Sequence, residues 1–394
     1  MATRICIVGG GTGGTMLANR LAAKLHSEIA QNKVKLTVLS NSPWHYFKPG
    51  LLYVPFGRYF KEDLRRSERS LLRPEVDFHV DEVSEFDYKA NRIHTRSGQH
   101  HEYDYLVIAT GLLSAPEQIE GLKEAGDHFY DYGPALRLAK KLKTIEKGRI
   151  FATVSFPEKC EIAHECGIAP VESILMLDEF LRQRGVRNQI ELVYSYPTLA
   201  MFQEHELFLQ KATSEVLPSI FESRDIHYQR DFTLGRVDPD EKVAYSAEGG
   251  AENFDILLAT PPPRPVDAVV HSLPARASTE GWLPTDPKTL KVRGLENVYV
   301  IGDTTDLPIS KAGGTAHAEA PVVVNNIVSE IRLGHTTDEY DGRVTAIGQM
   351  GLYAGMPLWY DYDSEVQPMP PTKLGGLMRR AFNRGYWSVA RGIM

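Results

Sequence analysis

A glycine-rich turn near the N-terminus limits what this chain can fold into more than any other feature. The turn Gly9-Gly10-Gly11-Thr12-Gly13-Gly14 follows an apolar run at residues 4–8 and precedes leucines that recur at helical spacing. In such a turn Gly9 permits a tight reversal, Gly11 lets the backbone approach a pyrophosphate, and Gly14 allows close helix packing. The helix N-terminus adds free N–H groups and a positive dipole end. The sequence therefore predicts a strand, a dinucleotide-binding turn and a helix.

Two series of alternating strands and helices follow from the apolar pattern. The first series has strands expected at residues 4–8, 35–40, 78–83, 92–95 and 105–109. The second series has strands expected at residues 149–155, 189–194 and 256–259, with a helix at residues 170–184. A strand at residues 297–301 and a helix at residues 319–333 then return to the first series. Each series predicts a βαβ unit with a parallel sheet.

This order predicts an α/β fold with two Rossmann-like domains and a small C-terminal region. The first domain is expected to be discontinuous and to comprise residues 1–112 and 265–335. The second domain is expected at residues 113–264, inserted into the first. The C-terminal region, residues 336–394, shows short alternating strands and then an amphipathic helical tail.

Composition narrows the possible partners and locations. The chain of 394 residues has a formal net charge of −7, which argues against nucleic acid as the main partner because no overall basic field exists. The three cysteines, Cys6, Cys160 and Cys166, are too few for a disulfide scaffold and are not spaced as a zinc site, so we expect no metal. The N-terminus lacks the regions of a signal peptide, and no apolar stretch approaches the length of a membrane span. We expect a cytoplasmic protein with peripheral membrane contact at most.

Two further segments make FAD the expected dinucleotide. The segment Ala109-Thr110-Gly111 follows a strand and resembles the turn that disulfide-reductase-type flavoproteins place against the cofactor. The segment Gly302-Asp303 resembles the second FAD signature of those proteins, in which the aspartate binds the ribityl chain. The second strand ends in Ser40-Asn41, so a hydroxyl or amide replaces the acid that usually binds the ribose hydroxyls.

The second domain lacks a glycine fingerprint of its own. After its first strand the chain runs from Ser155 to Pro170 through bulky residues and prolines. Such a loop cannot bring backbone N–H groups onto a pyrophosphate as glycine can. A nicotinamide substrate is therefore disfavoured, and we expect the electrons to come from a small molecule that reaches the flavin near this loop.

The sequence resembles the sulfide:quinone oxidoreductase and flavocytochrome c sulfide dehydrogenase flavoprotein family nearly end to end. The matching segments are the glycine turn, residues 46–51, residues 54–57, residues 109–111, Cys166 to Pro170, residues 261–263, Gly302-Asp303, Ser310-Lys311, residues 325–327 and residues 340–344. The resemblance implies FAD as cofactor, a small sulfur-compound donor and a quinone acceptor. The candidate cofactor contacts are Gly9, Gly11, Thr12, Gly14, Ser40, Asn41, Lys48, Pro49, Val83, Ala109, Thr110, Gly111, Gly302 and Asp303.

One departure from the family bears on the mechanism. In the family, a cysteine at the place of Cys166 works with a second cysteine shortly after the segment that resembles residues 340–344. This chain has Thr345-Ala346-Ile347-Gly348 there and no cysteine after Cys166. A third cysteine, present in some members, is also missing, because residues 129–133 occupy its region. The family's two-cysteine mechanism cannot operate unchanged.

The remaining thiols are the candidate catalytic groups. Cys160 and Cys166 lie on one loop, where a thiolate can receive sulfur and resolve through its neighbour as a disulfide. His164 and Glu165 lie between them and can move protons. Lys311 can stabilise negative charge that develops on the flavin or on a quinone. The alternatives are that these cysteines are inert, that His164 is a surface residue and that Lys311 is an ordinary residue at a helix start; Cys6, in the first strand, is expected only to pack.

The C-terminal tail is a candidate membrane contact. Its apolar residues fall roughly on one helical face: Leu374, Leu377, Met378, Ala381, Phe382, Tyr386 and Val389. Basic residues and Trp387 accompany them, which is the pattern of a helix lying in a lipid headgroup layer. A helix packed on the protein or on another subunit has the same periodicity. Gly385 and Gly392 weaken the helix, so a break into two pieces is expected there.

These observations support one leading hypothesis and two rivals. The leading hypothesis is an FAD-dependent oxidoreductase, similar to sulfide:quinone oxidoreductases, on the cytoplasmic side of the cell membrane. One rival is a type-2 NADH dehydrogenase, which the missing second fingerprint opposes. The other is an electron-transfer or sulfur-handling subunit that docks a protein partner through its tail, and a homo-oligomer also remains open.

Overall fold

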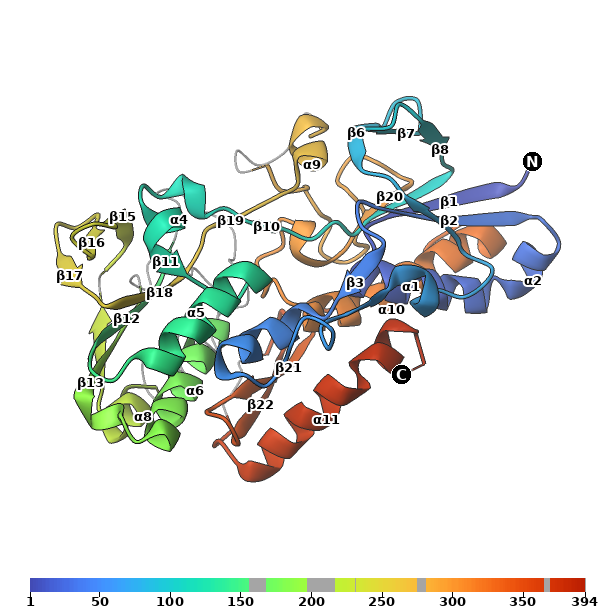
Figure 1. Ribbon diagram of the computed structural model, residues 1–394. Helices are drawn as coiled ribbons and strands as arrows, with labels where there is room; N and C mark the ends of the chain where they lie inside the picture. The colour runs from blue at the N-terminus through green and yellow to red at the C-terminus, as the bar shows by residue number, and fades with distance from the viewer. Residues whose placement is uncertain (156–167, 197–216, 231, 275–280, 365–368, 394) are drawn as a thin grey trace.

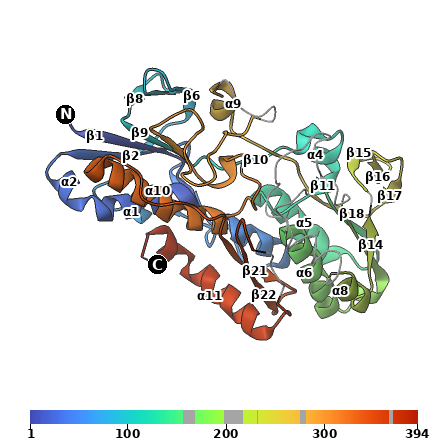
Figure 2. The same cartoon turned by 180° about the vertical axis from the view of Figure 1, so that it is seen from behind.

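The computed structural model describes residues 1–155, 168–196, 217–230, 232–274, 281–364 and 369–393. Two parallel sheets lie toward opposite ends of the molecule, and the C-terminal hairpin and helix lie along one side (Figure 1). The view from behind shows the same division (Figure 2). The chain passes from the first sheet to the second and back, because β20 near residue 300 pairs with β9 near residue 107.

The first sheet has five parallel strands in the order β20-β9-β1-β2-β5. Its strands are β1 (Thr3–Val8), β2 (Val34–Ser40), β5 (Asp77–Val80), β9 (Tyr105–Ile108) and β20 (Val298–Val300). Ile5 and Ile7 of β1 pack against the helices α1 (Thr12–Lys24) and α10 (Gly313–Leu333). Cys6 and Val8 point to the opposite face, which packs against a small antiparallel sheet of β6 (Val83–Asp87), β7 (Arg92–Thr95) and β8 (His100–Glu102). Cys6 is buried there, as expected.

The second sheet repeats this plan with five parallel strands in the order β11-β18-β12-β13-β14. Its strands are β11 (Gly126–Asp127), β12 (Gly148–Val154), β13 (Ile190–Tyr196), β14 (Ile226–Arg230) and β18 (Ile256–Thr260). One face packs against the helices α5 (Tyr132–Thr144), α6 (Ile168–Arg184) and α8 (Leu217–Ser223). The other packs against the antiparallel strands β15 (Leu234–Asp238), β16 (Val243–Ser246) and β17 (Ala251–Asn253). Two parallel sheets covered by helices confirm the predicted fold class.

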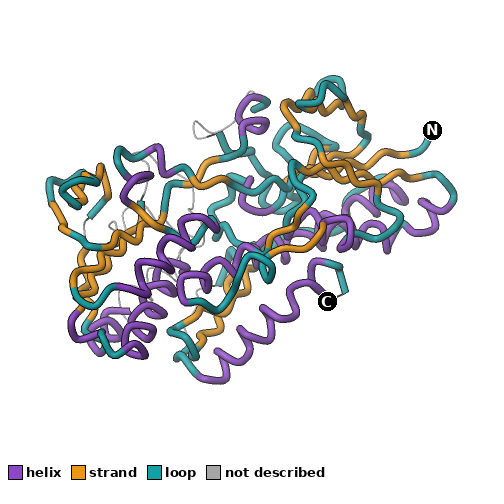
Figure 3. Tube along the Cα trace, viewed as in Figure 1, coloured by secondary structure: helices purple, strands orange, loops and turns teal. Residues whose placement is uncertain are grey.

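The C-terminal region is a hairpin followed by one long helix. The hairpin consists of β21 (Val344–Gln349) and β22 (Gly355–Tyr360). The helix, α11 (Lys373–Ala390), lies against this hairpin and reaches α1, and Figure 3 shows it as a continuous helix at the edge of the molecule. The shorter elements are α2 (His26–Ala30), β3 (Trp44–Tyr46), β4 (Arg65–Ser67), α3 (Glu68–Leu71), β10 (Leu113–Ser114), α4 (Leu122–Ala125), β19 (Pro263–Arg264) and α9 (Asp267–His271).

Three element predictions differ from the structure. The strand expected at residues 78–83 is two strands, because the chain leaves the parallel sheet after Val80 and enters the antiparallel sheet at Val83. The helix expected from residue 319 begins at Gly313. The break expected at Gly385 is wrong, because α11 runs through it and Gly392 lies beyond the helix end with a positive φ of 70°.

Candidate functional site

A cavity of about 880 Å³ lies beyond the carboxyl ends of the strands in the first sheet. Its walls include the segments that directly follow β1, β2, β9 and β20. Ligands of open parallel sheets bind at this edge, where the strand order reverses. The start of α6, strand β21 and helix α11 complete the cavity, so segments far apart in the sequence share one space.

The glycine turn has the geometry that the sequence predicts. Gly9 adopts a φ of +122°, which side chains other than glycine rarely tolerate. A Cβ on Gly14 would lie 1.9 Å from the carbonyl oxygen of Gly9, whereas a Cβ on Gly11 would meet nothing within 4 Å. Gly11 lines the cavity, and among the described residues no side chain caps the first N–H groups of α1. This open backbone with unpaired N–H groups fits a pyrophosphate.

The ribose end combines predicted and unpredicted groups. Ser40 and Asn41 line the cavity, as does Val83 at the start of β6. The cavity wall also contains Asp81 and Glu82, which the sequence analysis missed. The hydroxyl of Ser97 donates a hydrogen bond that lowers the pKa of Asp81, so this carboxylate is available to accept from hydroxyl groups. The acid absent from the end of β2 is thus present at the end of β5, its neighbour in the sheet.

The two flavin signatures meet at the cavity although they are far apart in sequence. Ala109, Thr110, Gly111, Gly302 and Asp303 all line it, together with Lys48 and Pro49. The hydroxyls of Thr110 and Thr304 lie 3.0 Å apart, and Thr304 donates to the carbonyl of Gly111. This contact ties the turn after β9 to the turn after β20.

Asp303 lies in a buried electrostatic cluster. Burial raises the pKa of the Asp303 carboxyl, while the positive charges of Lys48 and Lys311 act in the opposite direction. Behind it, Glu319 of α10 accepts the backbone N–H of Gly302 at 2.6 Å. Burial raises the pKa of Glu319 to about 8, so the carboxyl group that binds the Gly302 turn is largely neutral.

Lys311 lines the cavity but its ammonium group is already engaged. The Nζ donates to the backbone carbonyls of Asp303 at 2.9 Å and Thr305 at 2.7 Å. It also lies 4.1 Å from the ring centroid of Trp282. These contacts hold the Asp303 turn in place, and the predicted stabilisation of charge by Lys311 stays a prediction.

The predicted thiol site lies largely outside the described residues. Cys160, His164, Glu165 and Cys166 all fall in the segment 156–167. The described chain resumes at Ile168, which begins α6 and lines the cavity two residues after Cys166. Cys6 is the free cysteine of the described part, and burial raises the pKa of its thiol to about 12, so it is unreactive.

A buried acid on α6 is a site residue that the sequence analysis missed. Glu172 is 3% exposed, lines the cavity and accepts the backbone N–H of Gln349 at 2.5 Å. Its carboxylate lies 3.7 Å from the guanidinium of Arg379 on α11. Burial is the main cause that raises the pKa of Glu172, and Arg379 opposes it. An acid among the apolar residues at the start of this helix was the signal available in the sequence.

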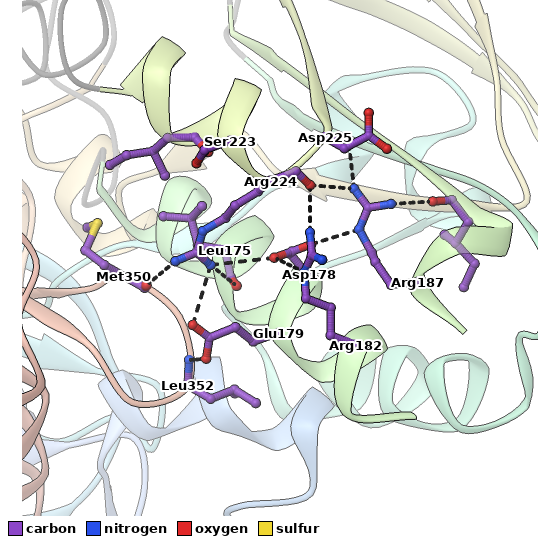
Figure 4. A network of polar contacts seen from close by, with 12 residues as sticks. Leu175, Asp178, Glu179, Arg182, Arg187, Ser223, Arg224, Asp225, Met350 and Leu352 are labelled. Carbon is purple, nitrogen blue, oxygen red and sulfur yellow. Dashed lines mark hydrogen bonds and ion pairs between the residues drawn. The ribbon is translucent and has the colours of Figure 1, made fainter. Parts of the chain in front are cut away.

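A second cluster on α6 fixes this helix against the C-terminal hairpin (Figure 4). Asp178 is buried and pairs with Arg187 at 2.8 Å and with Arg182 at 3.0 Å. Glu179 accepts the backbone N–H of Leu352 at 2.6 Å, and Arg224 donates to the carbonyl of Met350. These contacts hold the second half of α6 against the residues that directly follow β21, the strand that carries the residues at the place of the missing family cysteine.

The apolar face expected on helix α11 is exposed over part of its length and buried over the rest. Leu374, Leu377, Met378 and Phe382 are exposed by 66%, 56%, 46% and 42%. Tyr386 and Val389, predicted on the same face, are buried against the protein instead. The first half of the helix thus carries an exposed apolar surface, and the second half packs. Within the part of the chain that the structure describes, no helix has the length and apolar character to cross a bilayer.

Comparisons with known proteins agree with this architecture. Residues 3–154 match the family model described as pyridine nucleotide-disulphide oxidoreductase. The chain is 28% identical to the mitochondrial sulfide:quinone oxidoreductase of Dictyostelium discoideum, over 86% of this chain and 74% of that protein. It is 24% identical to the sulfide-quinone reductase of Aquifex aeolicus, over 100% of this chain and 92% of that protein.

Solved structures show the same fold. The X-ray structure of the Aquifex aeolicus sulfide:quinone oxidoreductase superposes with a TM-score of 0.83 at 21% identity, covering 99% of this chain and 92% of that chain. An NDH2 structure from Plasmodium falciparum superposes with a TM-score of 0.72 at 14% identity, covering 99% and 98%. A type II NADH:quinone oxidoreductase of Staphylococcus epidermidis is 29% identical over 36% of this chain and 34% of that protein.

Proposed function

Because this chain is an FAD-dependent oxidoreductase homologous to sulfide:quinone oxidoreductases over most of its length, we propose that it oxidises a small sulfur compound and reduces a quinone. The observation that carries the proposal is the lining of the cavity. One space is lined by the glycine turn, by the start of α6 and by the apolar side chains of Ile347, Leu358 and Phe382. A polar donor and an apolar acceptor can therefore both reach a cofactor bound in this space.

The chain's own residues have separable roles in this proposal. The N–H groups of the glycine turn bind the pyrophosphate, and Asp303 binds the ribityl chain. When bound, FAD would accept the electrons of the sulfur compound and pass them to the quinone. Cys160 and Cys166 form the sulfur site: hydrosulfide attacks one sulfur of their disulfide to give a persulfide, the other cysteine leaves as a thiolate, and bound FAD would accept the electron pair of that thiolate, with His164 taking the proton of the hydrosulfide.

Glu172 is the proposed proton source for the quinone. Reduction of a quinone consumes protons as well as electrons. The raised pKa means that Glu172 holds a proton at pH values where an exposed glutamate is ionised. Its neighbour Arg379 comes from α11, the helix that carries the exposed apolar surface, and both residues line the cavity.

Anaerobic titration of the bound flavin with sulfide tests the sulfur site. We expect sulfide to bleach the flavin of the wild type and of Cys6→Ala equally, because burial raises the pKa of the Cys6 thiol and keeps it unreactive. Cys166→Ser and Cys160→Ser should bleach much more slowly. Equal reduction of all four proteins would refute the thiol mechanism.

A type II NADH:quinone oxidoreductase is the second candidate, because such enzymes occur among the relatives. The bulky, proline-containing sequence after Ser155, which lacks a glycine fingerprint, opposes it. Rapid bleaching of the flavin by NADH, without bleaching by sulfide, would establish this alternative and exclude the first.

We further propose that the first half of α11 contacts the cytoplasmic face of the membrane. Its exposed leucines and Met378 form an apolar surface, and Lys373, Arg380 and Arg384 supply positive charge near it. This composition suits a lipid headgroup layer. A quinone would then enter the cavity beside Phe382, which is both exposed on α11 and part of the cavity wall.

A further inference from the structure

The second half of α11 ends in a buried hydrogen-bond chain that leads to the glycine turn. The hydroxyl of Tyr386 lies 2.7 Å from the hydroxyl of Thr12 and 2.6 Å from Nε2 of His45. The Nδ1 of His45 lies 3.0 Å from the carboxylate of Glu68, which also accepts the hydroxyl of Thr15 at 2.7 Å. The Tyr386 and Thr12 partners are separated by 374 positions in the sequence.

These hydrogen-bonded side chains are shielded from solvent for the most part. His45 and Glu68 are fully buried, and Tyr386 is 2% exposed. The rings of Phe47 and Trp387 pack around Tyr386 at centroid distances of 4.3 Å and 5.1 Å. Buried polar groups destabilise the fold unless each has a hydrogen-bond partner, so this hydrogen-bond chain specifies one arrangement of α11.

Other contacts hold the same end of α11 on the first domain. The side chain of Asn19 on α1 donates to the carbonyl of Ala390 at 3.0 Å. Arg391 donates to the carbonyl of Ser70 at 3.2 Å. These contacts with α1 and α3 support the position of Tyr386 from the C-terminal end of the helix.

Thr12 is the link between this chain and the cofactor site. It is the first residue of α1, at the helix N-terminus that fits a pyrophosphate, and both Thr12 and Tyr386 line the cavity. Phosphate oxygens only accept hydrogen bonds. If the Thr12 hydroxyl donates to a phosphate, it must accept from Tyr386, and Tyr386 must accept from His45. His45 then donates from Nε2, and its Nδ1 lies against the buried carboxyl group of Glu68 at 3.0 Å, which fixes the orientation of the ring.

We propose that Tyr386 is a positioning residue for the FAD pyrophosphate, acting through Thr12, so that the C-terminal helix completes the cofactor site. The inference rests on the proposed function only in placing FAD at the glycine turn. The docked second half of α11 thereby orients a hydrogen-bond donor, the Tyr386 hydroxyl, toward the cofactor site, while the first half remains exposed. Displacement of the docked half therefore weakens cofactor binding.

Binding of FAD to the apoprotein tests the proposal without any donor or acceptor. We expect Tyr386→Phe and Thr12→Val each to raise the Kd for FAD by about tenfold or more, because each interrupts a hydrogen-bond chain that ends on a charged group. Thr12→Ser retains the hydroxyl and should bind like the wild type. Tyr340→Phe is the matched control, because it removes a buried tyrosine hydroxyl that donates to the carbonyl of Arg343, outside the cavity.

Two further readouts separate positioning from general destabilisation. The ³¹P NMR signals of bound FAD should shift in Tyr386→Phe and not in Tyr340→Phe. The double variant Thr12→Val/Tyr386→Phe should bind FAD no more weakly than the poorer single variant, because both break one chain. Unchanged FAD affinity and unchanged ³¹P signals in Tyr386→Phe, or effects that multiply in the double variant, would overturn the proposal. Sulfide or quinone activity does not enter these measurements, so the proposed reaction stands or fails independently.

Discussion

Alanine substitutions at two glycines of the same turn should have opposite consequences. At Gly14 the added Cβ would lie 1.9 Å from the carbonyl oxygen of Gly9, an overlap of more than 1 Å with the backbone that the side chain cannot avoid. Helix α1 would have to move away from β1, although Met16 and Leu17 pack it into the core. Overpacking of this kind costs about 1–3 kcal/mol, and we expect Gly14→Ala to reach the upper end because the obstacle is backbone.

At Gly11 the same methyl group meets nothing within 4 Å, and the backbone angles of φ −104° and ψ −168° suit alanine. We expect the apoprotein to keep its stability or to gain about 0.4–1 kcal/mol, since alanine restricts the unfolded chain. The methyl group would instead fill the space over the N–H groups of α1. The Kd for FAD should therefore rise by about tenfold or more.

The assay is urea unfolding of the apoproteins combined with titration by FAD. Gly14→Ala should unfold at lower urea concentration than the wild type, whereas Gly11→Ala should not. Gly11→Ala that binds FAD as tightly as the wild type would show that the pyrophosphate does not lie on this turn. Gly14→Ala of unchanged stability would refute the steric reasoning.

Three other perturbations test the electrostatics and the surface. Burial raises the pKa of Glu319 from 4.5 to about 8 in the folded protein, so its contribution to the free energy of unfolding is complete below pH 4.5 and is lost as the pH rises to about 8. The loss is at most about 5 kcal/mol, at 1.36 kcal/mol per pKa unit. Glu319→Gln should remove this pH dependence in thermal unfolding, and an unchanged pH profile would contradict the assignment. Asp178→Asn leaves the buried Arg187 uncompensated and should lower the free energy of unfolding by about 3–5 kcal/mol in urea titrations, whereas a loss below about 1 kcal/mol would contradict the network. Leu374→Ser/Leu377→Ser should abolish sedimentation with anionic lipid vesicles while leaving FAD binding intact, because both side chains are exposed and lie outside the cavity wall; undiminished sedimentation would place the membrane contact elsewhere.

The predictable parts of the site are those that local chemistry specifies. Gly9 adopts a positive φ and Gly14 lies too close to the backbone for any side chain, whereas Gly11 keeps the space at the start of α1 open, so the turn can be recognised from a few adjacent residues. The segments ending at Gly111 and Asp303 could be recognised for the same reason, because each is a short strand followed directly by a turn. The parallel strand order of the first sheet then brings them to one edge.

The parts that escaped prediction depend on which surfaces pack together. Asp81 reaches the same part of the cavity wall as Ser40 and Asn41 only because β5 lies beside β2 in the sheet. Glu172 becomes a perturbed acid because α6 is buried against the C-terminal hairpin. The periodicity of α11 places Tyr386 with Phe382, but one side chain packs against the protein and the other meets solvent.

By itself the sequence determined the strand, turn and helix that bind a dinucleotide, the doubled α/β plan and the absence of a second glycine fingerprint, because each is set within a few residues of the chain. Only the tertiary structure decided that helix α11 docks by its second half and joins Tyr386 to Thr12 across 374 positions. Such a contact leaves no periodic trace in the chain, since it depends on burial and on hydrogen-bond partners that folding alone brings together.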